Sequence, residues 1–238
     1  MMTHNNSKNE ALPFIKIIAD TLELINIPVI DECKNIPVIS CIGTSLDGKS
    51  SLLDFYCQWV MDKYNLEPTP KYPFAISDSY ETKTNGIDFY QVEDKCMLFD
   101  CQGMGLDNAK YDHHLSLIVY LISNVIILTV RQRLDLQVFN NMLAMFSFLP
   151  QIEEQFRRKD KPKLIIRIKD SPYEKQLKKD STYLDKMVRK WLEKTGDHHD
   201  TIKQAFCDSF EIYVIATSPP VAITYISNES LNACLIVS

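Results

Sequence analysis

Glycine is scarce in this chain, and its distribution is uneven. Only six glycines occur in 238 residues, well under the roughly 7% of an average protein. They are Gly43, Gly48, Gly86, Gly103, Gly105 and Gly196. Glycine is needed where the backbone takes a positive φ or passes close to a ligand. Ordinary turns explain Gly196 well, but they explain poorly why the other five fall into three short segments.

Four further features of the sequence each argue against a class of protein. The seven cysteines include no C-x-x-C pair, so we expect reduced, mostly buried thiols and a cytoplasmic location. The formal net charge of −5 argues against a general nucleic-acid binder, which usually carries a basic patch. The longest apolar run, Leu115–Val130, is interrupted by Ser116, Ser123 and Asn124, so we expect no integral membrane segment. The first twelve residues also lack the apolar core of a signal peptide.

The pattern of apolar residues alternates between strand-like and helix-like stretches, which predicts an α/β fold. We expect three layers, with a central, mostly parallel sheet and helices on both faces. The length suits one domain over residues 1–238, with a flexible N-terminus at 1–13, a C-terminal extension at 221–238 and no helical middle domain. The expected strands are Ile36–Ile42, Gly86–Val92, Lys95–Asp100, Asn124–Val130, Lys163–Ile168 and Phe210–Ala216. The expected helices are Phe14–Ile25, Ser51–Tyr64, His113–Ile122, Leu134–Leu149, Ser181–Lys194 and Asp200–Phe206.

The segment Gly43–Ser50 matches the phosphate-loop pattern G-x-x-x-x-G-K-[ST] without exception, and it lies between a predicted strand and a predicted helix. Its backbone N–H groups are expected to surround a β-phosphate at the helix N-terminus. We expect Lys49 to bridge the β- and γ-phosphates, and the Ser50 hydroxyl to ligate Mg²⁺. The predicted nucleotide-binding residues here are Gly43, Thr44, Ser45, Leu46, Asp47, Gly48, Lys49, Ser50 and Ser51. The alternative is a chance match, and Asp47 is expected to face solvent because its charge would repel phosphate.

A second motif, D-x-x-G, spans Asp100–Gly103 at the end of a predicted strand. In phosphate-switch proteins this Asp holds the Mg²⁺ shell and the Gly N–H senses the γ-phosphate. A threonine from a preceding polar loop completes such a site, and we expect Thr84 in that place, with Thr82 as the alternative. The predicted metal ligands are therefore Ser50, Thr84 and Asp100. An ordinary polar loop is the competing interpretation for the threonines.

Recognition of guanine usually depends on an Asp at the end of a later strand, because one carboxylate accepts both the ring N–H and the exocyclic amine. The common N-K-x-D signature is absent, but the strand Lys163–Ile168 leads directly into Lys169 and Asp170. We expect these two residues to bind the base, and Thr217 to belong to a loop that caps it. The alternative is that Asp170 is only a cap or turn residue.

The order of these motifs resembles the large GTPase domain of the dynamin superfamily, in particular its guanylate-binding-protein and atlastin branch. That branch has a T-x-G-I loop, matched by Thr84–Ile87, and a D-x-x-G followed by another glycine, matched by Asp100–Gly103 and Gly105. The segment Leu121–Asn124 is similar to the end of its helix after that motif. The branch also has an Arg-Asp pair at the end of a strand, often followed by a Pro-Tyr-Glu-like segment. Residues Arg167–Glu174 resemble this stretch, with Lys169 in place of the arginine. The resemblance implies GTP and GDP as ligands, Mg²⁺ as cofactor, and pairing with a second copy or a related GTPase through the nucleotide face.

Two departures from that family bear on hydrolysis. Many members carry an arginine finger inside the phosphate loop, where this chain has Leu46; such an arginine contributes about 10³–10⁵ in rate. Met104 follows the D-x-x-G glycine and cannot orient a water as a glutamine does there, which leaves Gln102 as a weak candidate. The expected catalytic residues are Lys49, Thr84 and Gln102, in a slow GTPase. A nucleotide-binding pseudo-GTPase that acts as an interaction module is the alternative, and a P-loop ATPase or kinase is the third interpretation.

Overall fold

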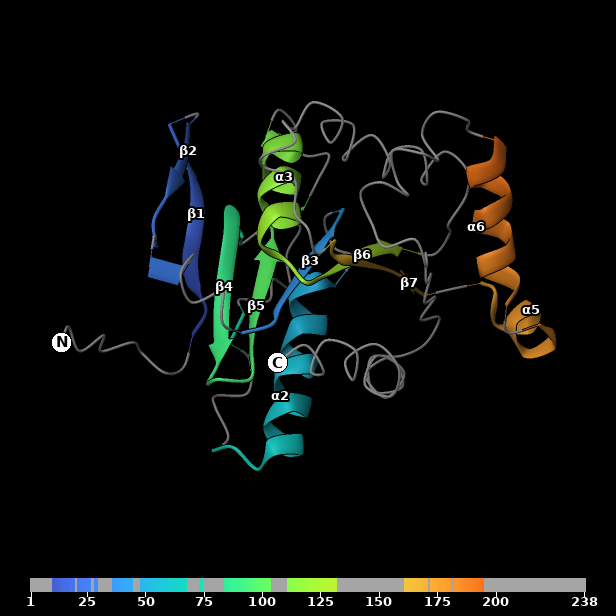
Figure 1. Cartoon of the computed structure of the whole chain (residues 1–238), viewed down its shortest axis with the longest axis horizontal. Helices are drawn as coiled ribbons and strands as arrows, with labels where there is room; N and C mark the ends of the chain where they lie inside the picture. The colour runs from blue at the N-terminus through green and yellow to red at the C-terminus, as the bar shows by residue number, and fades with distance from the viewer. Residues whose placement is uncertain are drawn as a thin grey trace.

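The computed structural model describes residues 10–19, 21–26, 28–29, 36–44, 48–67, 73–74, 84–103, 111–131, 161–170, 172–180 and 182–194. These residues form an α/β arrangement, with one seven-stranded sheet in the order β2-β1-β4-β5-β3-β6-β7 and helices beside it (Figure 1). The strands are β1 (Leu12–Ile18), β2 (Thr21–Leu24), β3 (Val38–Gly43), β4 (Gly86–Val92), β5 (Cys96–Cys101), β6 (Val125–Arg131) and β7 (Lys163–Lys169). The helices are α2 (Lys49–Tyr64), α3 (Asp112–Ile122), α5 (Glu174–Lys179) and α6 (Tyr183–Lys194).

The sheet is mixed, not mostly parallel as the sequence predicted. Strands β5, β3, β6 and β7 pair in parallel, whereas β2, β1 and β4 add on in antiparallel fashion, with β4 pairing to β5. Strands β4 and β5 are consecutive and joined by a tight turn at Glu93 and Asp94, as expected; Glu93 has φ 44° and Lys95 N–H bonds the carbonyl of Val92 at 3.0 Å. A turn this short permits only antiparallel pairing.

The helix predicted over Phe14–Ile25 is wrong, because these residues form the hairpin of β1 and β2. Ile15 pairs with Leu24 and Ile17 with Leu22 across that hairpin. Ala19 takes a left-handed φ of 44° between the two strands, which a helix does not allow. The apolar spacing of this segment fits both periods, and β-branched isoleucines favour the strand.

Two hydrophobic clusters, one on each face of the sheet, account for the helices on both sides. The first contains Leu115 and Val119 of α3 together with Leu184 and Val188 of α6. The second contains the buried residues of α2, Leu52, Leu53, Tyr56, Cys57, Val60 and Met61. Strand side chains alternate between the clusters, as the pleat requires.

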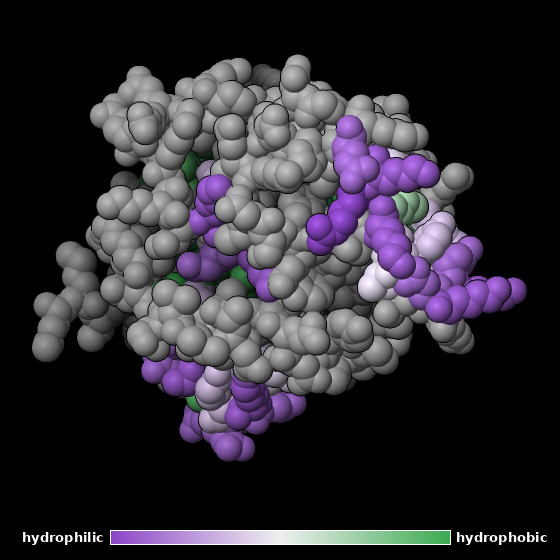
Figure 2. Space-filling view, turned by 45° about the vertical axis from the view of Figure 1, so that its right-hand side comes forward, coloured by the Kyte–Doolittle hydropathy of each residue, from purple (hydrophilic) through white to green (hydrophobic). Residues whose placement is uncertain are grey.

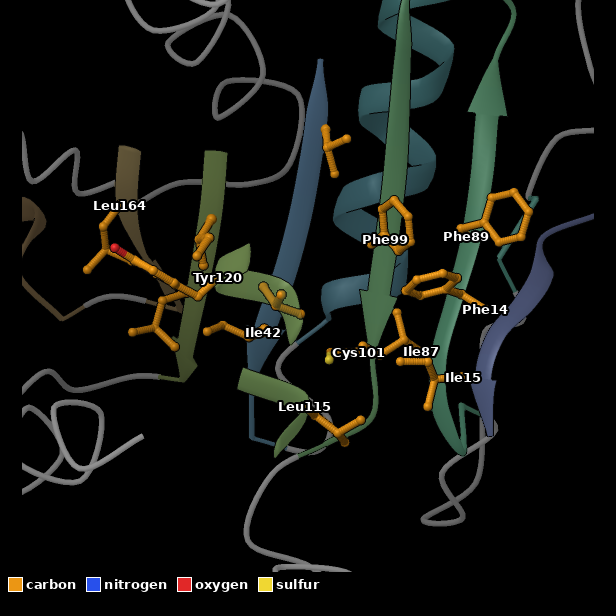
Figure 3. Close-up of a cluster of buried hydrophobic side chains, with 14 of the residues drawn as sticks. Phe14, Ile15, Ile42, Ile87, Phe89, Phe99, Cys101, Leu115, Tyr120 and Leu164 are labelled. Carbon is orange, nitrogen blue, oxygen red and sulfur yellow. The ribbon is translucent and has the colours of Figure 1, made fainter. Parts of the chain in front are cut away.

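The aromatic centre of the first cluster ties the antiparallel strands to the parallel ones. The Phe14 and Phe99 rings lie 5.2 Å apart edge to face, and Phe89 stacks on Phe99 at 5.9 Å. Figure 3 shows these three rings side by side on β1, β4 and β5, with α2 on the other side of the sheet. The hairpin is therefore packed against the same core as the strands that carry the predicted site.

The other predicted strands and helices agree with the structure to within one or two residues at most ends, as far as it describes them. The predicted elements Leu134–Leu149, Asp200–Phe206 and Phe210–Ala216 lie outside the described residues. Hydrophilic side chains gather where α5 and α6 meet the surface (Figure 2). Within the described parts of the chain, no helix has the length and apolar character that crossing a membrane requires.

Candidate functional site

The predicted phosphate loop lies at the carboxyl edge of the four parallel strands, between the end of β3 and the start of α2. Gly43 has φ +146° and Gly48 has φ +72°, both strained for any other residue. A side chain at Gly43 would also overlap the carbonyl and the hydroxyl of Thr129 on β6. Both glycines are thus required by the backbone. The loop residues Ser45, Leu46 and Asp47 lie outside the described part of the chain.

Lys49 closes the loop from its carboxyl side. Its Nζ donates a hydrogen bond of 2.8 Å to the carbonyl of Thr44, and the side chain is only 7% exposed. Gly48 caps α2, and its carbonyl accepts the first helical hydrogen bond, from the N–H of Leu52. Ser51 lies half-buried in the first turn. A buried cation and a helix N-terminus therefore meet here, and both favour an anion.

The three predicted metal ligands come together although they lie far apart in the sequence. Asp100 Oδ2 accepts hydrogen bonds from Ser50 Oγ at 2.6 Å and from Thr84 Oγ1 at 3.1 Å. Asp100 is 1% exposed, and its Oδ1 has no hydrogen-bond partner among the described residues. Burial raises the pKa of Asp100, while the bonds from Ser50 and Thr84 and the charge of Lys49 work against that rise.

These oxygens fit a magnesium ion better than most other metals. Within the described residues, no group of three or more His, Cys, Asp or Glu side chains is arranged to hold a metal. Mg²⁺, however, is usually held by one or two carboxylates together with substrate phosphates and waters. One buried carboxylate with a spare oxygen, flanked by two hydroxyls and facing a phosphate loop, suits that coordination.

Two further carboxylates lie on the α2 side of the sheet, and the sequence did not single them out. Burial, with the nearby charge of Asp100, raises the pKa of Asp54 to about 7 and that of Asp88 to about 6. Asp54 follows Ser50 by one helical turn, is 1% exposed and accepts the N–H of Phe74 at 3.0 Å. Asp88 pairs directly with Asp100 across β4 and β5. The sequence does offer a signal for Asp54, because it is an acidic residue inside an otherwise apolar stretch of α2.

Cations dominate the opposite side of the loop. Arg167 in β7 is 2% exposed, and its Nη1 donates to the carbonyl of Gly48 at 3.2 Å. The next residue on the same face, Lys169, places its Nζ 3.3 Å from where a Cβ at Gly48 would lie. Lys169 was predicted to serve the base, and it contacts the phosphate loop. Arg167 was not predicted, although a lone arginine within the apolar run of β7 is a signal that a sequence offers.

The predicted base-recognition residue Asp170 lies at the surface, in one long ion pair. It follows β7 with a left-handed φ of 54°, and its carboxylate lies 3.7 Å from Arg131 Nε at the end of β6. Both side chains are more than half exposed, so this ion pair contributes little to stability. Thr217 lies outside the described residues. Of the residues predicted to recognise a base, the described part of the chain thus shows Asp170 as an exposed acid paired with Arg131.

Gly86 joins the segment that carries Thr84 to the segment that carries Gln102. Gln102 is 5% exposed; its Oε1 accepts the N–H of Gly86 at 3.2 Å, and its own N–H bonds the Gly86 carbonyl. A Cβ at Gly86, where φ is +111°, would overlap the carbonyl of Ile15 in β1. This glycine is thus required by strand packing. Gly103 is buried two residues after the end of β5, and Met104 and Gly105 lie outside the described part of the chain.

Comparison with known proteins adds no relative to this picture. No protein-family model matches the chain, and no curated protein is significantly similar to it in sequence.

Proposed function

We propose that this protein binds GTP and GDP together with Mg²⁺, in a P-loop GTPase domain, and hydrolyses GTP slowly. The observation that carries the proposal is the bonding of Ser50 and Thr84 to the buried carboxylate of Asp100, beside Lys49 at the N-terminus of α2. These three side chains meet at one point, although Asp100 lies 50 residues from Ser50 and 16 from Thr84 in the sequence.

Each residue has a role that follows from its position. The N–H groups at the start of α2 and the ammonium of Lys49 bind the β- and γ-phosphates. Ser50, Thr84 and Asp100 would hold Mg²⁺, which would neutralise part of the phosphate charge. Gly103 is close enough to this carboxylate in sequence to offer its N–H to the γ-phosphate. Asp170 accepts hydrogen bonds from the N–H groups of guanine, and Lys169 lies against the loop at Gly48.

We expect slow hydrolysis because of two side chains, Leu46 and Gln102. Leu46 supplies no charge from within the loop, and the Gln102 oxygen is already engaged by the N–H of Gly86. Gln102, the predicted candidate for orienting water, therefore already uses its side-chain oxygen within the protein. This engagement favours a second candidate, a pseudo-GTPase that binds nucleotide and acts as an interaction module, for example by pairing through the nucleotide face.

The decisive experiment has two stages. Nucleotide is first extracted from natively purified protein and identified, and the dissociation constants of GTP, GDP and ATP are measured with Mg²⁺. We expect guanine nucleotide, with ATP competing poorly; equal competition by ATP would reject the base assignment. A single-turnover assay at saturating protein then separates the candidates, because the absence of phosphate release over hours leaves only the pseudo-GTPase.

A further inference from the structure

One hydrogen bond beside the predicted metal ligands uses a side chain where a strand pair ordinarily uses the main chain. In a regular antiparallel pair, two opposite residues exchange both of their N–H···O bonds. Gly86 and Gln102 lie directly beyond the register pair of Ile87 and Cys101. The main-chain N–H of Gln102 bonds the Gly86 carbonyl at 2.9 Å, but the Gly86 N–H donates to the side-chain Oε1 of Gln102 at 3.2 Å. The Gln102 side chain therefore takes the place of a main-chain carbonyl.

This arrangement lets the main chain leave the sheet at Gln102, one residue before Gly103, without leaving a buried donor unpaired. Gly86 is buried and Gln102 is only 5% exposed, so an unpaired Gly86 N–H would cost free energy. Two hydrogen bonds also fix the orientation of a residue, whereas a single bond lets it rotate about that bond. Gln102 therefore holds Gly86 in one orientation beside the end of β5.

The orientation of Gly86 bears directly on Thr84, which lies two residues earlier. Thr84 is half-buried, and its Oγ1 donates to the Oδ2 of Asp100 at 3.1 Å. Asp100 in turn lies two residues before Gln102. The bond between Gly86 and Gln102 thus connects the segment that carries the threonine to the strand end that carries the carboxylate, and it helps to set the distance that the threonine hydroxyl must span.

Strand β1 supports the same segment from the other side. The Nδ2 of Asn85 donates to the carbonyl of Ile17 at 3.0 Å. The backbone of Gly86 lies so close to the carbonyl of Ile15 that a Cβ there would overlap it. Because β1 contains none of the predicted site residues, these contacts anchor the segment without relating it to the carboxylate of the site. The bonds to Gln102 supply that relation.

We propose that Gln102 is a positioning residue for Thr84. Its side-chain oxygen holds Gly86 and so keeps the Thr84 hydroxyl within reach of Asp100. The inference rests on the proposed function, because it assigns a role within the same site. It goes beyond that function by giving Gln102 a task in binding the γ-phosphate state of the nucleotide, where the sequence suggested a task in orienting water.

The test compares the affinities of a non-hydrolysable GTP analogue with Mg²⁺ and of GDP without Mg²⁺. Gln102→Met replaces the amide with an apolar end of similar length, while its main-chain N–H can still bond Gly86. We expect the analogue to bind about tenfold more weakly, as an unpaired buried donor implies, and GDP affinity to stay unchanged. Gln91→Met is the matched control, because Gln91 lies exposed at the other end of β4 and bonds Glu93; it should change neither ligand.

A double-mutant cycle with Thr84→Val separates positioning from a general loss of stability. Thr84→Val removes the hydroxyl that Gln102 is proposed to hold in place, so it should weaken binding of the analogue in the otherwise wild-type protein. If Gln102 acts through Thr84, the double variant should bind the analogue no more weakly than Thr84→Val alone. Additive losses overturn the inference, and so does a Thr84→Val variant with wild-type affinity, because no hydroxyl then needs positioning.

The outcomes also separate this inference from the proposed function. A wild-type protein that binds neither GDP nor the analogue contradicts the function itself. Wild-type binding with unchanged analogue affinity in Gln102→Met overturns only the role of Gln102, and slower phosphate release in that same variant would return the residue to orienting water. If Gln102→Met fails to fold, Gln102→Asn decides, because its shorter side chain withdraws the oxygen from Gly86. Wild-type affinity for the analogue in Gln102→Asn overturns the inference.

Discussion

The two ends of the candidate site, which we propose bind phosphate and base and call the phosphate end and the base end, are built in different ways. At the phosphate end, Lys49, Ser50 and Asp100 are buried or partly buried and bonded to the chain around them. At the base end, Asp170 is more than half exposed and meets Arg131 at 3.7 Å. Buried polar groups must be satisfied within the protein, so the phosphate end is arranged before any ligand arrives. The exposed acid has no such constraint, and its orientation depends on what binds to it.

If the phosphate end is preorganised, Lys49 should have the largest effect of any single residue. Lys49→Met removes the cation that bonds Thr44 and that is expected to contact two phosphates. We expect GTP and GDP affinity to fall by at least about 100-fold, because cation–phosphate contacts are strong where water is excluded. Fluorescence titration with each nucleotide measures the change.

Lys63→Met is the matched control for that measurement. Lys63 lies in the last turn of the same helix, beside the Trp59 ring and far along α2 from the loop. Its loss should leave nucleotide affinity unchanged. Similar nucleotide affinities for Lys49→Met and Lys63→Met would contradict the assignment of Lys49 to phosphate binding.

The base end should show a smaller and more selective effect. Asp170→Asn keeps the shape of the side chain but accepts only one of the two guanine N–H groups. We expect GDP affinity to fall about tenfold and the preference for GTP over ATP to disappear, while pyrophosphate binding stays constant. Arg131→Met is the control, because losing an exposed ion-pair partner costs at most about 1 kcal/mol. An unchanged preference in Asp170→Asn would move base recognition elsewhere.

The same contrast explains how much of the molecule the sequence could predict. The strand, the glycine conformations and the helix around the predicted phosphate loop were predictable because Gly43, Gly48 and Lys49 act through local backbone geometry and adjacent elements. Phosphate binding by this loop stays a prediction. The hairpin at Leu12–Leu24 was not, because its apolar spacing fits a helix and a strand equally well. The mixed sheet was predictable in part, because the tight turn at Glu93 and Asp94 already requires antiparallel β4 and β5. The pairing of β1 with β4 joins distant strands, which a local pattern does not record.

Residues that act over long sequence distances escaped prediction for a related reason. Arg167 bonds Gly48 across 119 positions, and Asp54 bonds Phe74 across 20. A lone charge in an apolar run signals that a partner exists, but only the fold says which. The metal ligands Ser50, Thr84 and Asp100 were predicted despite such distances, because their motif order supplied the pairing. That pairing is present in the structure, and their binding of Mg²⁺ stays a prediction.

Ser50→Ala tests the metal half of the phosphate end. The variant removes a hydroxyl that both donates to Asp100 and is expected to ligate Mg²⁺. Without this hydrogen bond the pKa of Asp100 should rise further, so the carboxylate is harder to ionise. We expect the tightening of GDP binding by Mg²⁺ to shrink by several-fold, measured by titration across magnesium concentrations. Ser51→Ala, one residue along α2, should keep the full tightening by Mg²⁺, because Ser51 is predicted to contact the nucleotide and not the metal. An equal loss of this tightening in the two variants contradicts the metal assignment.

The smallest effect concerns the free energy of unfolding. It comes from Asp54, the buried carboxylate one helical turn after Ser50 in α2. Burial raises its pKa from 3.8 to about 7, so between these values the folded state holds a proton that the unfolded state has released. The free energy of unfolding contributed by this group therefore falls as the pH rises through that window. Asp54→Asn keeps the acceptor for the Phe74 N–H and removes the ionisation. We expect the variant to gain on the order of 1 kcal/mol over the wild type at about pH 8, and nothing at about pH 4.

Denaturant unfolding at both pH values, without Mg²⁺, measures this difference. Asp62→Asn, at an exposed position of the same helix, should show no pH-dependent gain. A constant difference between Asp54→Asn and the wild type across the range would mean that Asp54 is ionised in the folded protein. The carboxylate would then reinforce the negative charge around Asp100, and the phosphate end would attract Mg²⁺ through two acids rather than one.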